Sequence, residues 1–377
     1  MPPVPPPHQP RIITYYQTHH DKAGNHISVL PLLQQQGIAL THLILAAIHL
    51  NEDPAALTLN DHRPDHPRFT TLWAELRILQ AAGVKVLAML GGAAKGSYAR
   101  LDGDDPAAFE AYYRPLAHLI RTRGLDGLDL DVEEPMSLAG VVRLIDRLRA
   151  DFGPGFLITL APVAAALLNH EHNLSGFDYE ALEAMRGRDI AWYNAQFYCG
   201  WGDCSNPVMY EMLLLRGWAP DKIVVGLVTN PGNGSGWVPW NILATLLPFL
   251  VGKHARFGGV MGWEYFNSLP GAEARPWEWA QIMTALLRGQ HQRTGAAGVA
   301  AAVSPTPAPP PAVAALMDGG GGVGRAVTAT VKVEGDGNQK DQQARREVVV
   351  VGEGVPDDDD GPVPVPRAFD YYSDAAE

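Results

Sequence analysis

Eight repeats of a short apolar run followed by a longer amphipathic run constrain the fold of this chain most strongly. They occupy residues 11–288, and such alternation is typical of α/β architecture. Eight strand-then-helix units match a (β/α)8 TIM barrel, a fold of about 250 residues. The predicted strands are residues 11–16, 41–48, 84–92, 125–132, 156–163, 190–198, 222–228 and 258–265.

A doubly wound open sheet is the alternative α/β fold. Such sheets carry about five to six strands and a glycine-rich phosphate-binding turn after the first strand. Here the first strand leads into QTHHDK, and no glycine follows it before Gly24. We therefore predict the barrel, with helices over residues 69–83, 105–124 and 137–153, the last beginning at an N-cap Ser137.

The domain organisation follows from a change of composition near residue 289. The catalytic barrel is predicted over residues 11–288, after a flexible N-terminus at residues 1–10. Residues 289–377 are rich in Ala, Pro and Gly and then in acidic side chains. Such a composition buries too little apolar surface to offset chain entropy, so we predict a disordered tail.

The charge and hydropathy of the chain limit the kinds of partner and the cellular location that we expect. The net charge is −12 and no long basic run occurs, which argues against nucleic acid. No apolar stretch reaches the roughly 20 residues that span a bilayer, so no membrane association is expected. We expect a cytosolic monomer because the first residues lack signal-peptide features, or an extracellular protein if the start is truncated.

Two minor features bear on the same question of compartment. Cys199 and Cys204 are the only cysteines. Free thiols are the favoured interpretation, and a loop-closing bridge in an oxidising compartment is the alternative. Asn173 and Asn233 begin N-x-S triplets, which accept glycans only in a secreted protein.

The predicted strand LDGLDLDVEE, residues 125–134, combines buried-type and acidic residues. Side chains alternate along a strand, so Asp129, Asp131 and Glu133 share one face while the leucines between them share the other. In a barrel the acidic face points to the axis. Asp129 then lies about 13 Å deeper than Glu133, which reaches the C-terminal mouth where barrel active sites are built.

Three stacked carboxylates repel one another and lose hydration. If the carboxyl groups share a proton, their repulsion decreases and the pKa of at least one of them rises. This would keep Glu133 protonated as a general acid. Asp129, Asp131 and Glu133 together form an acidic ladder along the strand. This ladder offers one acid at the rim and no second one across a cleft, which suits a substrate that supplies its own nucleophile. Glu134 points to the opposite face and is interpreted as a structural or subsite residue.

Two other interpretations of the acidic run are less favoured. A solvated edge strand conflicts with the apolar residues interleaved in it. A divalent-metal site could recruit His19 and His20, but adjacent residues on an extended segment point in opposite directions. We therefore expect no metal and no cofactor.

The run LDGLDLDVE resembles the DGxDxDxE signature of glycoside hydrolase family 18, whose members are TIM barrels that cleave bonds following N-acetylglucosamine. The resemblance implies that Glu133 protonates the glycosidic oxygen. It also implies that Asp131 orients the 2-acetamido group as its carbonyl oxygen attacks the anomeric carbon, and that Asp129 supports Asp131. Net retention through an oxazolinium-type intermediate would follow.

Other segments extend the resemblance. NAQFY is similar to the family's QFY segment and places Gln196 and Tyr198 at the floor of the site, with the Tyr198 hydroxyl donating to the acetamido oxygen. GGVMGWEYFN resembles GGxMxW, which makes Trp263 the platform beneath the −1 sugar, and Tyr15 matches a tyrosine near the catalytic aspartates. Further substrate-binding candidates in these motifs are Asp126, Asn194, Glu264, Tyr265 and Asn267.

One position departs from the family pattern. Many members carry SxGG on the third strand, where this chain has Met89 to Gly92, so the buried aspartates are expected to lack a serine partner. The segments RLRADFGPGFLITLAPV, NLSGFDYEALEA and GGVMGWEYFNSLPG most resemble fungal endo-β-N-acetylglucosaminidases. The predicted function is therefore cleavage of the N-glycan core. The alternatives are a chitinase and a carbohydrate-binding protein that has lost catalysis.

Overall fold

Eight parallel strands form a closed barrel in the computed structural model, which describes residues 8–289. Pairing of β1 with β2 closes the sheet, and β3 (Thr58–Leu59) adds a short antiparallel pairing to β2. The predicted TIM barrel and all eight strands are confirmed. The predicted tail lies outside the described residues from residue 290 onward, as do residues 1–7. The barrel strands are β1 (Arg11–Tyr16), β2 (His42–His49), β4 (Lys85–Gly91), β5 (Gly127–Asp131), β6 (Leu157–Leu160), β7 (Trp192–Gln196), β8 (Ile223–Val228) and β9 (Gly259–Trp263).

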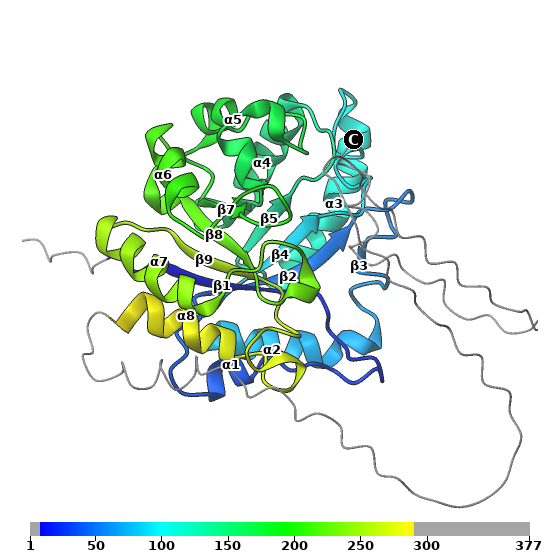
Figure 1. Cartoon of the computed structure of the whole chain (residues 1–377). Helices are drawn as coiled ribbons and strands as arrows, with labels where there is room; N and C mark the ends of the chain where they lie inside the picture. Colours follow the sequence, from blue (N-terminus) through cyan, green and yellow to red (C-terminus); the bar gives the residue numbers. More distant parts are fainter. Residues whose placement is uncertain (1–7, 290–377) are drawn as a thin grey trace, which may run out of the picture. The chain divides into compact units, whose positions relative to one another are not determined.

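Helices surround the strands (Figure 1). The predicted helix after β5 is present, and Ser137 caps it by accepting a hydrogen bond from the Gly140 amide at 2.9 Å. Gly153 ends this helix at a φ of 73°, a backbone conformation that favours glycine. The helices are α1 (Pro31–Gln34), α2 (Thr70–Ala81), α3 (Pro106–Arg123), α4 (Leu138–Phe152), α5 (Tyr179–Arg186), α6 (Val208–Leu215), α7 (Trp240–Lys253) and α8 (Glu278–Arg288).

The buried apolar residues form two clusters on the two faces of the sheet. The outer cluster lies between strands and helices and contains Leu128, Leu130 and Val132. The inner cluster fills the barrel with side chains such as Leu87 and Met89 of β4. The predicted alternation along β5 is therefore confirmed, because its apolar residues face the helices and its acidic residues face the axis.

Aromatic and cationic side chains close the end of the barrel from which the strands begin. The Arg11 guanidinium lies 4.4 Å from the ring centre of Trp192, the first residue of β7. The His42 ring contacts Trp192 edge-on, with ring centres 4.7 Å apart. The Trp192 indole donates to Asn194 Oδ1 at 2.9 Å. This layer supports the residues above it, and a substrate must approach from the opposite mouth.

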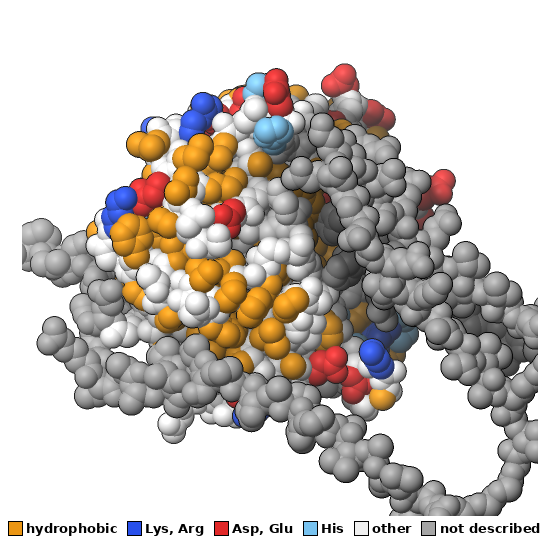
Figure 2. Space-filling model, in the orientation of Figure 1, with side chains coloured by type: hydrophobic (Ala, Val, Ile, Leu, Met, Phe, Trp, Pro, Cys, Tyr) orange, Lys and Arg blue, Asp and Glu red, His pale blue; other side chains and the backbone are white. Residues whose placement is uncertain are grey.

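The outer surface mixes apolar and charged side chains (Figure 2). Val208, Met212 and Leu215 share one face of α6 and are exposed, and Phe249 on α7 is also exposed. Among the helices of residues 8–289, none has the length and apolar character needed to cross a membrane.

Candidate active site

The acidic ladder runs up the barrel axis and ends at the mouth. Asp129 is fully buried within β5, Asp131 is its last residue and is 6% exposed, and Glu133 lies two residues beyond the strand and is half-buried. The structure thus brings the three carboxyl groups together in the predicted order of depth. Only Glu133, the outermost, has substantial access to the mouth.

Three donors surround the deepest carboxylate, that of Asp129. Thr159 Oγ1 and Asn194 Nδ2 donate to Oδ1 at 2.5 and 3.0 Å, and Tyr15 Oη donates to Oδ2 at 2.7 Å. Burial raises the pKa of Asp129, and the three hydrogen bonds oppose that rise. Burial and the nearby charges of Asp129 and Asp131 raise the pKa of Tyr15, so its phenol stays protonated and acts as a donor.

Asp131 and Glu133 form a hydrogen-bonded pair directly above Asp129. Burial, then the charges of Glu133 and Asp129, raise the pKa of Asp131 well above its usual range. Gln196 Nε2 lies 3.2 Å from both Asp131 Oδ1 and Glu133 Oε1, and it also donates to the Ala161 carbonyl at 2.9 Å. The pair therefore favours the protonated form of Asp131, and Gln196 contacts both carboxyl groups.

Thr159 supplies the hydroxyl that the Met89 position lacks. Met89 of β4 and Thr159 of β6 flank Asp129 on neighbouring strands at the same level. The sequence prediction that the aspartates lose a partner at Met89 is correct for β4, but Thr159 on β6 compensates. No motif marks Thr159 in the sequence, because its place beside Asp129 depends on the register of β5 against β6.

The aromatic candidates lie around the same mouth. Tyr198 follows β7 and is 6% exposed, and Trp263 ends β9 and is half-buried. The Tyr15 ring packs edge-on against Trp263, with ring centres 5.5 Å apart. Tyr15 is only 1% exposed. It holds Asp129 through its hydroxyl and packs against Trp263, and its predicted substrate contact stays a prediction.

Asp126 lies at the opposite end of β5 from the mouth. Its carboxylate accepts hydrogen bonds from Gln80 Nε2 at 2.8 Å and the Val86 amide at 2.9 Å, and pairs with Lys85 Nζ at 2.9 Å. Burial by itself would raise the pKa of Asp126, but these donors lower it overall. The predicted substrate contact is corrected to a structural one, because Asp126 is on the closed side of the barrel.

Two further substrate-binding candidates also have structural roles. Asn194 is fully buried beside Asp129. The Glu264 carboxylate accepts from the Gln17 amide at 3.0 Å and from the Thr18 amide and hydroxyl at 2.8 Å, which joins the ends of β9 and β1. Both side chains have contacts within the protein, and their predicted substrate-binding roles stay predictions.

Glu134 is buried and holds the loop after β4. Its carboxylate accepts from the Gly96 amide at 2.6 Å and the Tyr98 amide at 2.7 Å. This is the structural role expected for the residue that faces away from Glu133. In the same region the Gly92 amide donates to the Asp131 carbonyl at 2.9 Å, and a Cβ at Gly91 would lie 2.6 Å from that oxygen. The two glycines let the loop approach the acidic ladder closely.

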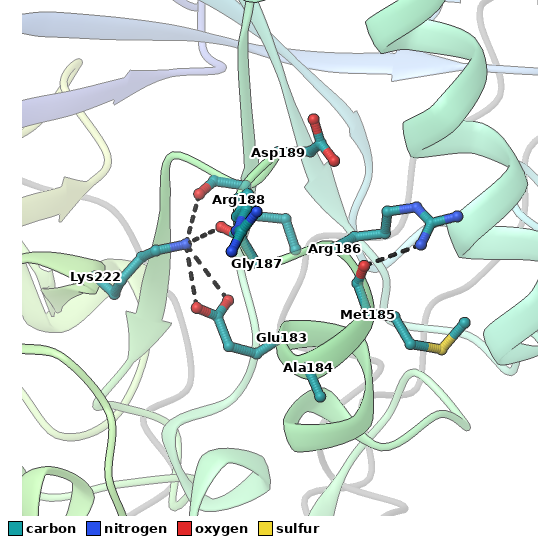
Figure 3. Close-up of a pocket in the computed structure, with 9 residues that line it drawn as sticks. Glu183, Ala184, Met185, Arg186, Gly187, Arg188, Asp189 and Lys222 are labelled. Carbon is teal, nitrogen blue, oxygen red and sulfur yellow. Dashed lines mark hydrogen bonds and ion pairs between the residues drawn. The ribbon is translucent and has the colours of Figure 1, made fainter.

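A surface pocket lies away from the ladder, where β7 and β8 begin (Figure 3). Lys222 Nζ donates to the carbonyls of Gly187 and Ile190 at 2.5 and 2.6 Å and pairs with Glu183 at 3.3 Å. Lys222 thus ties the end of α5 to the start of β8. Within residues 8–289 no group of three His, Cys, Asp or Glu side chains has an arrangement that could hold a metal ion.

Comparisons with known proteins agree with the geometry. The sequence model of Glycosyl hydrolases family 18 matches residues 11–234, which is more than half of the chain. A solved fungal endo-β-N-acetylglucosaminidase of family 18 is 53% identical, with 74% of this chain and 99% of that one covered and a TM-score of 0.72. A chitinase from Aspergillus fumigatus is 56% identical, with 73% and 98% covered and a TM-score of 0.67.

A curated relative, Chitinase 2 of Rhizopus oligosporus, is 30% identical over 213 residues. The match covers 51% of this chain and 36% of that relative, so the chain spans about a third of its length. The family match, the barrel and the acidic ladder at its mouth lead to one assignment. The chain belongs to glycoside hydrolase family 18.

Proposed function

We propose that this protein is a retaining endo-β-N-acetylglucosaminidase that cleaves the GlcNAc-β1,4-GlcNAc core of N-glycans by substrate-assisted catalysis. The observation that carries the mechanism is the hydrogen-bonded Asp131–Glu133 pair at the barrel mouth. Asp131 lies below Glu133 on one strand, and not across a cleft from it. This placement favours one acid aided by the substrate over two opposed carboxylates.

The proposed reaction has two steps. Glu133 gives its proton to the glycosidic oxygen while the 2-acetamido carbonyl oxygen attacks the anomeric carbon, which breaks the glycosidic bond and forms an oxazolinium ion. The Glu133 carboxylate then takes a proton from water as the water oxygen attacks the anomeric carbon and the ring opens. Two inversions give net retention.

The other residues have defined roles in this proposal. Asp131 stabilises the positive charge that develops on the acetamido nitrogen, and the Tyr198 hydroxyl donates to the acetamido oxygen. The Trp263 ring supports the apolar face of the −1 sugar. Asp129, held by Thr159, Asn194 and Tyr15, fixes Asp131 from below.

A chitinase is the second candidate, because the Aspergillus fumigatus chitinase is as similar in sequence as the endo-β-N-acetylglucosaminidase. The test is to incubate the protein separately with a high-mannose glycoprotein and with chitin oligosaccharides of four or more units, and to weigh the released sugars. Release from the glycoprotein alone supports the proposal. Turnover of the oligosaccharides alone supports the chitinase. Saturable binding without product in either reaction would favour the carbohydrate-binding alternative.

A further inference from the structure

The loops after β8 and β9 are joined by two asparagine side chains that face each other. Asn233 Nδ2 lies 2.8 Å from Asn267 Oδ1, and Asn267 Nδ2 lies 2.7 Å from Asn233 Oδ1. Both residues are half-buried. Each amide is donor and acceptor to the other, an arrangement that fixes the orientation of both side chains.

The same pair reaches the main chain of Trp263. Asn233 Nδ2 also lies 3.2 Å from the Trp263 carbonyl oxygen, which accepts from the Thr229 amide at 2.8 Å as well. A third asparagine joins from the loop after β8, since Asn230 Nδ2 donates to the Asn267 carbonyl at 2.8 Å. The Trp263 backbone is therefore held from the β8 side, while Tyr15 contacts its ring from the β1 side.

The other end of the β8 loop is fixed against β7. The Cys199 amide donates to the Ser235 carbonyl at 3.0 Å. A Cβ at Gly234 would lie 2.7 Å from Cys199 Sγ, so the loop fits there only without a side chain. Both ends of the segment that carries Asn233 are thus anchored on strands of the barrel, and Asn233 has a rigid base from which to hold Trp263.

We propose that Asn233 is a positioning residue, which acts through its hydrogen bond to the Trp263 carbonyl to hold the indole ring as a sugar platform. The inference rests on the proposed function, because that function makes Trp263 the platform. Asn267 holds Asn233 in place and has the supporting part.

Two matched aspartate variants separate the two amides. Asn233→Asp keeps an acceptor for Asn267 but removes the donor to Trp263. Asn267→Asp keeps an acceptor for Asn233 and leaves the bond to Trp263 in place. Both variants introduce one carboxylate at the same amide pair, so they carry a comparable charge and differ in the contact to Trp263.

The first readout is the environment of the ring and needs no substrate. Proteins are labelled with 5-fluorotryptophan, and the Trp263 signal in the fluorine NMR spectrum is assigned with Trp263→Phe. We expect Asn233→Asp to shift or broaden that signal and Asn267→Asp to leave it close to the parent position. Equal spectra for parent and Asn233→Asp, with only a lower melting temperature, would overturn the positioning role.

The second readout is sugar affinity, measured by calorimetry with a high-mannose glycopeptide in a Glu133→Gln background. Asn233→Asp should weaken binding about tenfold, and Asn267→Asp less than half as much. Equal weakening by both variants would overturn the proposal. Failure of the Glu133→Gln parent to bind, with a fluorine signal that still responds to Asn233→Asp, would contradict the proposed function and leave the positioning of Trp263 supported.

Discussion

Asp126 and Asp131 lie at the two ends of strand β5, and their carboxyl groups are held in opposite electrostatic states. At the closed end, donors from Gln80, Val86 and Lys85 outweigh burial and lower the pKa of Asp126. At the mouth, burial and the neighbouring carboxylates raise the pKa of Asp131. One short strand thus connects a carboxyl group whose ionised form is favoured to one whose protonated form is favoured.

The contrast arises from the neighbours of each residue and not from its position in the motif. Asp126 meets a lysine, the Gln80 side chain and the Val86 amide at the outer edge of the barrel, whereas Asp131 meets two other carboxyl groups on the axis. General acid catalysis requires an environment like that of Asp131, because a carboxylate paired with cationic or amide donors does not retain a proton near neutral pH.

The largest expected effect on the rate is at Glu133, the outermost residue of the acidic ladder. Glu133→Gln keeps the shape of the side chain but cannot give a proton, so kcat should fall about 10²- to 10⁴-fold. The measurement is the rate of sugar release from whichever substrate the parent hydrolyses. A variant with more than half of the parental rate would show that the proton comes from another group.

Removal of the hydroxyl at Thr159 tests whether β6 supports the ladder. Thr159→Val should cost about 1.5 to 3 kcal/mol of unfolding free energy, because the buried Asp129 carboxylate loses a donor. Thr159→Ser keeps the hydroxyl and is the matched control, with a smaller loss. Urea unfolding of both variants at neutral pH measures the difference. Equal stability of the two variants would show that the Thr159 hydroxyl does not stabilise the folded protein.

The smallest effects are the most specific, because they should have opposite signs at the two ends of β5. The lowered pKa of Asp126 contributes stability above about pH 4, and that contribution is lost as the pH falls through the folded-state pKa. Asp126→Asn should therefore cost about 1 kcal/mol at neutral pH. The difference in stability between Asp126→Asn and the parent should disappear at acidic pH. Melting temperatures of both proteins measured against pH follow this difference.

Asp131 has the reverse dependence. Its raised pKa means that the folded protein binds the proton more tightly, so the parent loses stability as the pH rises from about 4 through the folded-state pKa. Asp131→Asn removes this loss and should gain stability relative to the parent as the pH rises. A parallel pH dependence for both asparagine variants would contradict the proposed contrast between the two ends.

The sequence was sufficient for the barrel and for the order of the acidic ladder, since both follow from the alternation of side chains along single strands. It was insufficient for contacts between strands. Thr159 was missed because its bond to Asp129 depends on the register of β5 against β6. Asp126 was misplaced, and the internal contacts of Asn194 and Glu264 were not foreseen, because membership of a motif does not reveal which end of a strand, or what depth, a side chain occupies.

Retention of the anomeric configuration, which the proposed two-step reaction requires, is tested most directly by the configuration of the newly formed product. Proton NMR of the first minutes of hydrolysis, with a high-mannose glycopeptide or a chitin oligosaccharide as substrate, distinguishes the two anomers before they equilibrate. The proposed retaining reaction gives the β-anomer as the initial product. Initial release of the α-anomer would contradict it.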